Sequence, residues 1–509
     1  MKRLLLYFCI ILLPSVCFAE DIYISQIAQG ADSGSNCSNS HSLTWFNTSG
    51  NWGGSGTDGK ISPGDTAHLC GTFTSTATVQ GSGVAGNVII ILFESGAKFS
   101  KAAWGDSTSS AIYSSGKSYL VIDGGTNGII ESTDNGDSMS GKGISQIAAG
   151  VYLIGASYSE IKNLTVQNMY MHTEGTTGGM TSGGCIWLTD SSNVEVHNNT
   201  LNNDYFAIHA TSLSSSVSNV NIYSNTISAC STGMVVANNP GRSISAVNIY
   251  SNNILMGDNW DNASGDNHVD GIHIWSVYNA ADTITGLKIY DNYIHGDVGM
   301  TQSTKWSSGY IYMEYDIIDP LIYNNILACE SGQCPSLGNI AIKGRTTSPG
   351  ASSPKVYNNT IIGVDGTGSS GSGIYLGNDS NMTPIIINNI IKYQYMGIND
   401  AGGSATITSD SNDFNGNNWV GHKGSYYTTL VNWQALGSDL HSTDANPQLD
   451  ANYRLTASSP ASVTAGGVNL SSLFTIDKDN HVRPSAPVPW SIGAYQYLGR
   501  RPTAPPNLR

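Results

Sequence analysis

The sequence contains few charged residues, since Asp, Glu, Lys and Arg together make up 12% of its 509 residues. Basic residues are the scarcer kind, with 22 Lys plus Arg against 37 Asp plus Glu, which gives a formal net charge of -15. A surface so poor in cations argues against nucleic acid or an anionic membrane surface as a partner, because both are bound through Lys and Arg. A polyanionic substrate would need calcium or a local basic patch.

Long hydrophobic runs are absent beyond the first residues. Leu4 to Leu13 is an apolar stretch behind Lys2 and Arg3, and Ala19 ends a plausible cleavage site, so residues 1–19 are predicted to be a secretory signal. The stretch is too short to span a bilayer, and no later one reaches about 18 apolar residues, so no transmembrane segment is expected. We expect an exported monomer, either secreted or at the cell surface.

Cysteine is also scarce. Six of the eight Cys remain after the signal, and an even number in an exported chain permits three disulfides. The most local pair is Cys329 with Cys334, and a bond between Cys37 and Cys70 would pin the first coil. No Cys/His spacing suggests zinc.

Segments with helical periodicity are nearly absent, and short alternating strands recur instead. The phrase Val247-Asn248-Ile249-Tyr250-Ser251-Asn252-Asn253-Ile254 has similar copies along the chain. The Asn that closes the turn falls at positions 199, 225, 252, 292, 325, 359 and 389, so subtraction gives spacings of 26, 27, 40, 33, 34 and 30. Such periods mark a stacked repeat, and strand-only units predict the coils of a parallel β-helix.

The repeated Asn residues are predicted to be structural rather than catalytic. Asn tolerates the left-handed backbone of a sharp corner, and its amide can bond to the turn of the next coil. This role follows from the stack itself, because each coil must join its neighbour to bury a continuous core.

The two ends of the repeat carry a resemblance. The opening Pro63-Gly64-Asp65-Thr66 and the closing segments Asp477 to Pro484 and Trp490 to Tyr495 resemble those of bacterial exported proteins of the pectate-lyase-like superfamily. The resemblance implies an all-β fold, a right-handed parallel β-helix. That superfamily includes lyases, hydrolases, epimerases and non-catalytic surface proteins, so the resemblance says little about function.

This pattern divides the chain into five parts. Residues 20–60 form a loop-rich N-terminal segment that leads into the first coil, and residues 61–415 form the coils. Residues 416–498 are expected to form C-terminal coils and a cap, with some helical character at 430–437. Residues 499–509 are expected to form a tail after the cap.

One strand of each coil is predicted to present an outward strip of aromatic and polar side chains, because alternation turns its aliphatic residues inward. Sugar faces stack on such rings while hydroxyls take polar partners, so we expect a polysaccharide to bind in a groove along residues 187–375. The alternative is that exposed Tyr and Trp only cover the sheet. The predicted strip consists of Trp187, His209, Val236, His273, Trp275, Tyr310, Tyr312, Glu314, Lys343 and Tyr375, with Arg345 beside it.

The stretch from Asp266 to Trp275 lies in the repeat with the longest spacing, and long inserts often lie on the binding face. In a hydrolase, two of the nearby carboxylates would act as acid and as base or nucleophile. These carboxylates are Asp266, Asp270, Glu314 and Asp316.

In a lyase, Lys343, Arg345 or calcium would neutralise a uronate, and His273, Lys343 or Tyr312 would take its C5 proton. The catalytic candidates are therefore Asp270, His273, Glu314 and Lys343. The alternative for Asp270 is a structural role, because an Asp before a Gly is more often a turn residue than a catalyst. Calcium is the one cofactor to consider, with Asp258, Asp261 and Asp266 as its ligands.

The function predicted from these residues is cleavage of a polysaccharide by a lyase or glycoside hydrolase. The alternative is a non-catalytic surface or adhesive rod that binds glycan. An enzyme should bring two titratable groups to one sugar linkage, whereas a rod should leave them scattered or bonded to turns.

Overall fold

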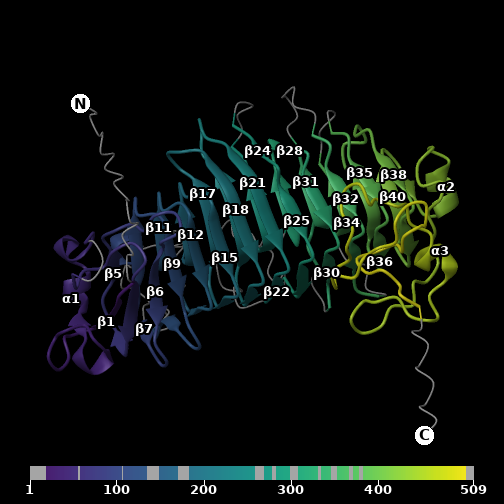
Figure 1. Ribbon diagram of the computed structural model, residues 1–509. Coiled ribbons are helices and arrows are strands. Elements are labelled where there is room, and N and C mark those ends of the chain that lie inside the picture. The colour runs from purple at the N-terminus through teal and green to yellow at the C-terminus, as the bar shows by residue number, and fades with distance from the viewer. Residues whose placement is uncertain are drawn as a thin grey trace, which may run out of the picture.

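The computed structural model describes residues 19–54, 58–105, 107–134, 148–169, 183–257, 269–277, 282–298, 308–330, 334–344, 352–365, 371–377 and 382–499. The chain winds into a rod whose walls are three long sheets, and consecutive strands pass from one sheet to the next (Figure 1). Every strand pair is parallel except β40 (Trp419–Lys423) with β41 (Tyr426–Tyr427) at the end of the rod, among the described residues. The structure thus confirms the predicted right-handed parallel β-helix.

Sheet 1 begins at the N-terminal end of the rod and runs its full length. Its strands, in spatial order, are β2 (His41–Ser42), β1 (Asp21–Ser25), β3 (Thr66–Cys70), β6 (Ile89–Phe93), β9 (Leu120–Asp123), β12 (Ser159–Lys162), β15 (Val194–His197), β18 (Val217–Tyr223), β21 (Ile244–Tyr250), β25 (Lys288–Tyr290), β29 (Leu321–Tyr323), β32 (Lys355–Tyr357), β35 (Ile385–Ile387) and β38 (Thr408–Asp410), with β24 (Ile284–Thr285) and β28 (Ile317–Ile318) off this path.

Sheets 2 and 3 form the other two walls. Sheet 2 contains β4 (Thr72–Phe73), β7 (Lys98–Lys101), β10 (Ile129–Ser132), β13 (Thr165–Gln167), β16 (Thr200–Asn202), β19 (Thr226–Ser228), β22 (Asn253–Met256), β26 (Tyr293–Gly296), β30 (Ile326–Ala328), β33 (Thr360–Ile362), β36 (Ile390–Lys392) and β39 (Asp413–Asn415). Sheet 3 contains β5 (Ala77–Val79), β8 (Ile112–Ser115), β11 (Ala149–Ile154), β14 (Gly184–Thr189), β17 (Phe206–Ser212), β20 (Thr232–Asn238), β23 (Asp270–Trp275), β27 (Ile311–Glu314), β31 (Gly338–Lys343), β34 (Ser372–Leu376), β37 (Met396–Asp400), β40 and β41.

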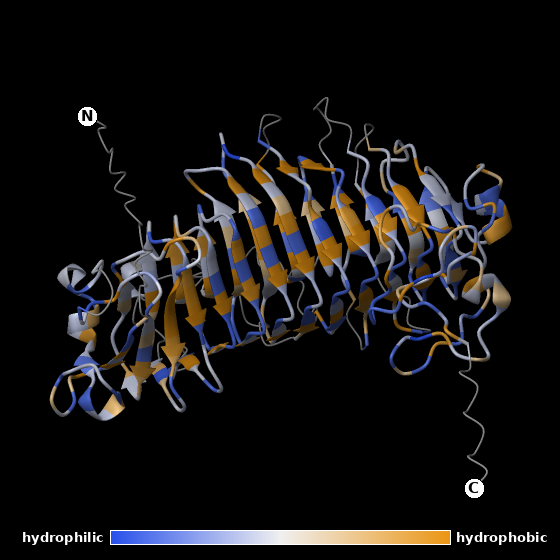
Figure 2. Cartoon of the chain, in the orientation of Figure 1, coloured by the Kyte–Doolittle hydropathy of each residue, from blue (hydrophilic) through white to orange (hydrophobic). Residues whose placement is uncertain are grey.

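The core consists of aliphatic side chains stacked in register from coil to coil, because inward positions repeat every second residue. Figure 2 shows the resulting alternation of apolar and polar residues along the strands. One column of sheet 1 is fully buried along its whole run: Ile122, Ile161, Val196, Ile222, Ile249, Ile289, Ile322, Val356 and Ile386.

The predicted Asn ladder is confirmed at the corner between sheets 1 and 2. Between its two ends, each ladder Asn donates its side-chain amide to the next ladder Asn and accepts from the previous one, as in the 3.0 Å bond from Asn252 Nδ2 to Asn292 Oδ1. The left-handed residue of this corner is the one just before the ladder Asn, for example Ser251 with φ of 55°. The ladder comprises Asn199, Asn225, Asn252, Asn292, Asn325, Asn359, Asn389 and Asn412.

The C-terminal part does not simply continue the stack. Beyond β41 the chain forms α2 (Leu430–Gln434) and α3 (Ala461–Thr464) and then runs back along the rod, drawn in yellow in Figure 1. Corner side chains donate to its backbone, with bonds from Asn388 to Val468, from Asn358 to Ser491 and from Asn324 to Ile476. At the other end, α1 (Leu43–Phe46) and the 3-10 turns Cys37–Asn39 and Ser49–Asn51 precede the regular coils, and a third turn spans Ser107–Ser109.

Two of the three disulfides that the sequence permits are present. Cys37 is bonded to Cys70 and Cys329 to Cys334, as expected. Cys185 and Cys230 are buried free thiols. None of the helices in the described ranges is long and apolar enough to cross a membrane.

Candidate functional site

The outward face of sheet 3 carries the aromatic and polar strip that the sequence predicts. In register from coil to coil it reads Tyr113, Tyr152, Trp187, His209, Val235, His273, Tyr312, Ala341, Tyr375, Asn399 and His422. A neighbouring outward row contains Trp275, Glu314 and Lys343 in register. We call these two rows the sheet 3 strip.

Two residues predicted to face outward do not. Tyr310 is fully buried in the core, where its hydroxyl donates to the carbonyl oxygens of Gly296 (2.5 Å) and Ala328 (3.3 Å). Val236 is also a core residue, and Val235 takes its predicted place. Tyr310 therefore cannot contact a substrate.

The cause is a break in the alternation at the start of each sheet 3 strand. Two consecutive residues face the core there, such as Tyr310 and Ile311. In other coils the first of the two is Gly, and a Cβ on Gly271 would lie 2.6 Å from the side chain of Ile294 in sheet 2. Strict period-2 counting shifts the pattern by one residue at this point.

The polar centre of the strip is Glu314. Its Oε1 accepts a hydrogen bond from the Tyr312 hydroxyl and lies 3.4 Å from Lys343 Nζ, and its Oε2 lies 3.4 Å from His273 Nε2. The ammonium group of Lys343 also lies 5.1 Å from the centre of the Tyr312 ring. Trp275 stands opposite Glu314 on the neighbouring strand and is 37% exposed.

These contacts decide the charge of Glu314. Burial raises the pKa of this carboxyl group, but the close approach of His273, the hydrogen bond from Tyr312 and the charge of Lys343 outweigh it and bring the pKa to about 2. Burial, together with the hydrogen bond to Glu314, raises the pKa of Tyr312. Near neutral pH, Glu314 is therefore a carboxylate and Tyr312 a protonated phenol.

Asp270 lies behind this cluster rather than on its surface. Its side chain is fully buried, and Oδ1 accepts from the backbone N–H groups of Ser308 (2.8 Å) and Gly309 (2.9 Å). Oδ2 lies 3.6 Å from His273 Nδ1. Asp270 thus holds the backbone that leads into β27 (Ile311–Glu314) of the next coil and faces His273, which stands between it and Glu314.

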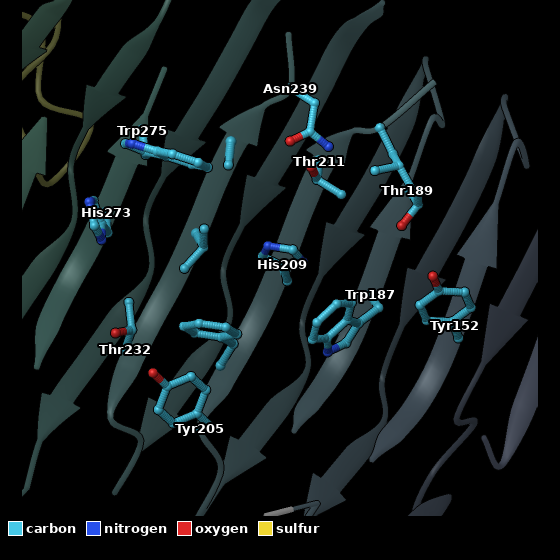
Figure 3. A pocket seen from close by; sticks show the side chains of 14 residues that line it. Tyr152, Trp187, Thr189, Tyr205, His209, Thr211, Thr232, Asn239, His273 and Trp275 are labelled. Carbon is cyan, nitrogen blue, oxygen red and sulfur yellow. The ribbon is translucent and has the colours of Figure 1, made fainter. Parts of the chain in front are cut away.

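A cavity of about 430 Å³ adjoins the cluster on the N-terminal side. Figure 3 shows Tyr152, Trp187, His209 and His273 in a row across the strands of sheet 3, with Trp275 beside His273. The whole lining consists of Tyr152, Trp187, Thr189, Tyr205, Phe206, His209, Thr211, Leu213, Thr232, Val235, Ala237, Asn239, His273 and Trp275.

The rings of this cavity support one another. The centre of the His209 ring lies 4.3 Å from that of Trp187 and 5.4 Å from that of Phe206, and Tyr205 packs on Phe206 at 4.3 Å. Burial lowers the pKa of His209 to about 4, so its imidazole is neutral near neutral pH. Trp187 Nε1 lies against Gly184, where a Cβ would approach it to 1.7 Å, so only Gly leaves room for the indole.

The predicted site residues thus fall into three groups. Asp270, His273, Tyr312, Glu314, Lys343 and Trp275 come together, and Trp187 and His209 line the adjoining cavity. Tyr375 is half-buried farther along the strip. Asp258, Asp261, Asp266 and Arg345 lie outside the described residues, so the calcium hypothesis stays a prediction. Within the described ranges, no cluster of His, Cys, Asp and Glu is suited to a metal ion.

The sequence reading missed several residues that line the cavity. Tyr152 lies one coil before the first strand of the predicted strip, and the alternation Val151-Tyr152-Leu153 would have included it. Tyr205 lies at the turn before β17 and Phe206 at its first residue, where period-2 counting gives no direction. Their position depends on how sheets 2 and 3 meet.

No family model matches the chain, and no curated protein matches it. Solved structures similar to it include the pectate lyase Pel9A, at 14% identity over 94% of this chain and 97% of that one, with a TM-score of 0.38. XylC in complex with xylose has 10% identity over 94% and 98% of the two chains and a TM-score of 0.43. The lacto-N-biosidase from Eubacterium ramulus has 13% identity over 76% and 65%, with a TM-score of 0.45. The fold assignment rests on the three sheets of the chain itself.

Proposed function

We propose that this protein is an exported enzyme that cleaves a polysaccharide bound along the sheet 3 strip. The observation that carries the proposal is the position of Glu314, an ionised carboxylate within 3.4 Å of both His273 and Lys343, next to an aromatic cavity. An enzyme of this kind needs two titratable groups at one linkage, and His273 with Glu314 supplies them.

In the hydrolytic form of the proposal, Glu314 and His273 divide the work. The Glu314 carboxylate faces the anomeric carbon while the bond between this carbon and the leaving oxygen breaks. His273 gives the leaving oxygen a proton. Water then adds to the anomeric carbon and returns a proton to His273. Asp270 is a positioning residue, because it is buried and faces His273 Nδ1.

Lys343 favours elimination as the second candidate. Its side chain is 38% exposed beside Glu314, so it can neutralise the carboxylate of a uronate. His273 would then take the C5 proton, the C4–O bond would break to leave a C4–C5 double bond, and water would give the leaving oxygen its proton. The third possibility is a non-catalytic rod. Its support is Asp270, which accepts from the backbone N–H groups of Ser308 and Gly309 in the next coil, as a structural residue would.

The test is a panel of neutral and acidic polysaccharides with and without calcium, read by reducing ends and by unsaturated-uronate absorbance together. Reducing ends alone indicate hydrolysis, and a rise in both signals indicates a lyase. Binding without either signal contradicts the enzyme and leaves the rod.

Glu314→Gln is expected to lower turnover about 100-fold or more, because the amide carries no negative charge to stabilise the anomeric carbon as its bond to the leaving oxygen breaks. Glu195→Gln is the matched control, because Glu195 also accepts from a tyrosine hydroxyl (Tyr223, 3.0 Å) but lies on sheet 1. A Glu314→Gln variant that keeps its melting temperature and stays within threefold of the wild-type rate would refute the role of Glu314.

Two properties of the whole chain belong to the same proposal. Export is supported by the disulfides Cys37–Cys70 and Cys329–Cys334, which form and persist in oxidising compartments. We also propose that the protein acts as a monomer, with a molar mass in solution near 54 kDa or slightly less, since the full chain is 53.7 kDa before signal removal.

A further inference from the structure

The sheet 3 strip changes from charged to uncharged at the cavity. None of the described residues that line it is Asp, Glu, Lys or Arg, whereas Glu314 and Lys343 lie on the strands just beyond His273. Away from His273 at its edge, a group that binds in the cavity therefore meets aromatic rings, hydroxyls and the neutral imidazole of His209. A carboxylate bound there, away from His273, would lose its hydration without gaining a Lys or Arg partner from the lining, which is costly.

Two polar atoms in the cavity wall lack a partner. Trp187 Nε1 and His209 Nδ1 are buried and have no hydrogen-bond partner within the part of the chain that the structure describes. The indole N–H only donates, so it needs an acceptor. A buried polar group without a partner destabilises the protein, and a ligand that pairs with it gains affinity.

We propose that this cavity binds the acetyl group of an N- or O-acetylated sugar residue in the glycan. The carbonyl oxygen of an acetyl group is an acceptor for Trp187 Nε1–H, and its methyl group suits the apolar wall formed by Phe206 and Val235. The hydroxyls of Thr189 and Thr211 are partners for the hydroxyls of the same sugar. The inference deepens the proposed function, on which it rests, by naming the substrate class.

The position of the cavity fixes the register of the glycan. The cavity extends from β11 to β23, four inter-strand steps of about 4.8 Å each, so it is longer than one sugar ring. His273 lines the cavity and also faces Glu314. The acetylated sugar thus occupies the cavity while the neighbouring linkage lies over Glu314.

The test measures binding without turnover. The full-length mature chain with Glu314→Gln is applied to an oligosaccharide array with four classes: N-acetylated, O-acetylated, unsubstituted neutral and uronate. We expect binding of acetylated glycans, with the matched unsubstituted glycan at least about tenfold weaker. Mild alkali removes O-acetyl esters and leaves N-acetyl amides, so loss of binding after alkali identifies the ester. Saturation-transfer NMR on a bound glycan should show its methyl protons in contact with the protein.

Variants connect the binding to the cavity. Trp275→Ala, an exposed residue at the cavity edge, and Trp187→Ala should each weaken binding at least about tenfold. Tyr250→Ala is the matched control, because Tyr250 also belongs to a stacked row of rings, with Tyr223 and Tyr290, but lies on sheet 1 and outside the sheet 3 strip, and it should stay within twofold.

Three outcomes would overturn the inference: binding only of uronates, equal binding of acetylated and unsubstituted glycans, or no acetylated glycan bound. The first of these leaves the proposed function standing. If the wild-type chain binds acetylated glycans but cleaves none of them, the result contradicts the proposed function and supports the cavity as a binding site.

Discussion

Replacing a single ladder asparagine should destabilise the rod far more than its size suggests. Asn252 is buried, and Nδ2 donates to Ile222 O and Asn292 Oδ1, both at 3.0 Å. Its Oδ1 accepts from the backbone N–H and the side-chain amide of Asn225, again at 3.0 Å each. These four bonds tie three consecutive coils together, and Asn252→Ala removes all of them, along with the bond from Nδ2 to Tyr250 O of its own coil (3.0 Å).

At about 1 kcal/mol of net stability for each hydrogen bond, the loss amounts to about 4 kcal/mol. The loss should not be smaller than this, because the substitution leaves the former hydrogen-bond partners of Asn252 buried without a partner. Asn248→Ala is the control, because Asn248 is half-buried on sheet 1 and donates one bond to Asn221 Oδ1 (2.9 Å). Its loss should be about 1 kcal/mol or less.

Urea unfolding followed by both circular dichroism and tryptophan fluorescence measures the two changes in the free energy of unfolding. The two probes should agree, since neighbouring coils stabilise one another. If Asn252→Ala and Asn248→Ala cost the same within about 0.5 kcal/mol, the ladder does not stabilise the stack in the way described.

Two further predictions concern the site. The pKa of His209 falls from 6.5 to about 4 on folding, so the unfolded chain binds a proton that the folded chain does not. Stability therefore falls as the pH drops from 6.5 to 4, by about 3 kcal/mol for this group, and His209→Gln should flatten that part of the stability curve; an unchanged slope in urea titrations would contradict it. Gly271→Ala would place a Cβ 2.5 Å from the backbone oxygen of Tyr310, so it should cost about 1–3 kcal/mol and lower activity through His273. Gly50→Ala, with nothing within 4 Å of the added atom, should leave melting temperature and activity unchanged.

The architecture could be predicted from the sequence because each coil repeats the same pattern of residues. The Asn that ends each strand, the alternation before it and the spacing of 26 to 40 residues all recur, so one coil predicts the next. The pairs Cys37–Cys70 and Cys329–Cys334 followed from position alone. The short helix at 430–434 also lies where the sequence places helical character.

The site was harder to predict. It depends on which residues of each alternating strand face outward, and the alternation alone does not give that. Tyr310 was misplaced because two consecutive residues face the core at the start of each sheet 3 strand. Strict alternation assigns one of these two residues to the wrong side. Glu314 and His273 were found because they follow the break. Tyr205 and Phe206 enter the cavity from a corner, whose direction is set by the packing of two sheets.

Because the C-terminal segment returns along the rod, the coils can form before this segment packs against them. Neighbouring rungs of the Asn ladder are 23 to 40 residues apart, so coils can stack as the chain emerges. Lys478, by contrast, donates to the backbone of Asp291, 187 residues earlier, and Phe474 stacks on Tyr323 at 4.4 Å. This corner stays uncovered until nearly the whole polypeptide has been made. A truncated chain is thereby distinguishable from a finished one by the aromatic surface that it leaves exposed.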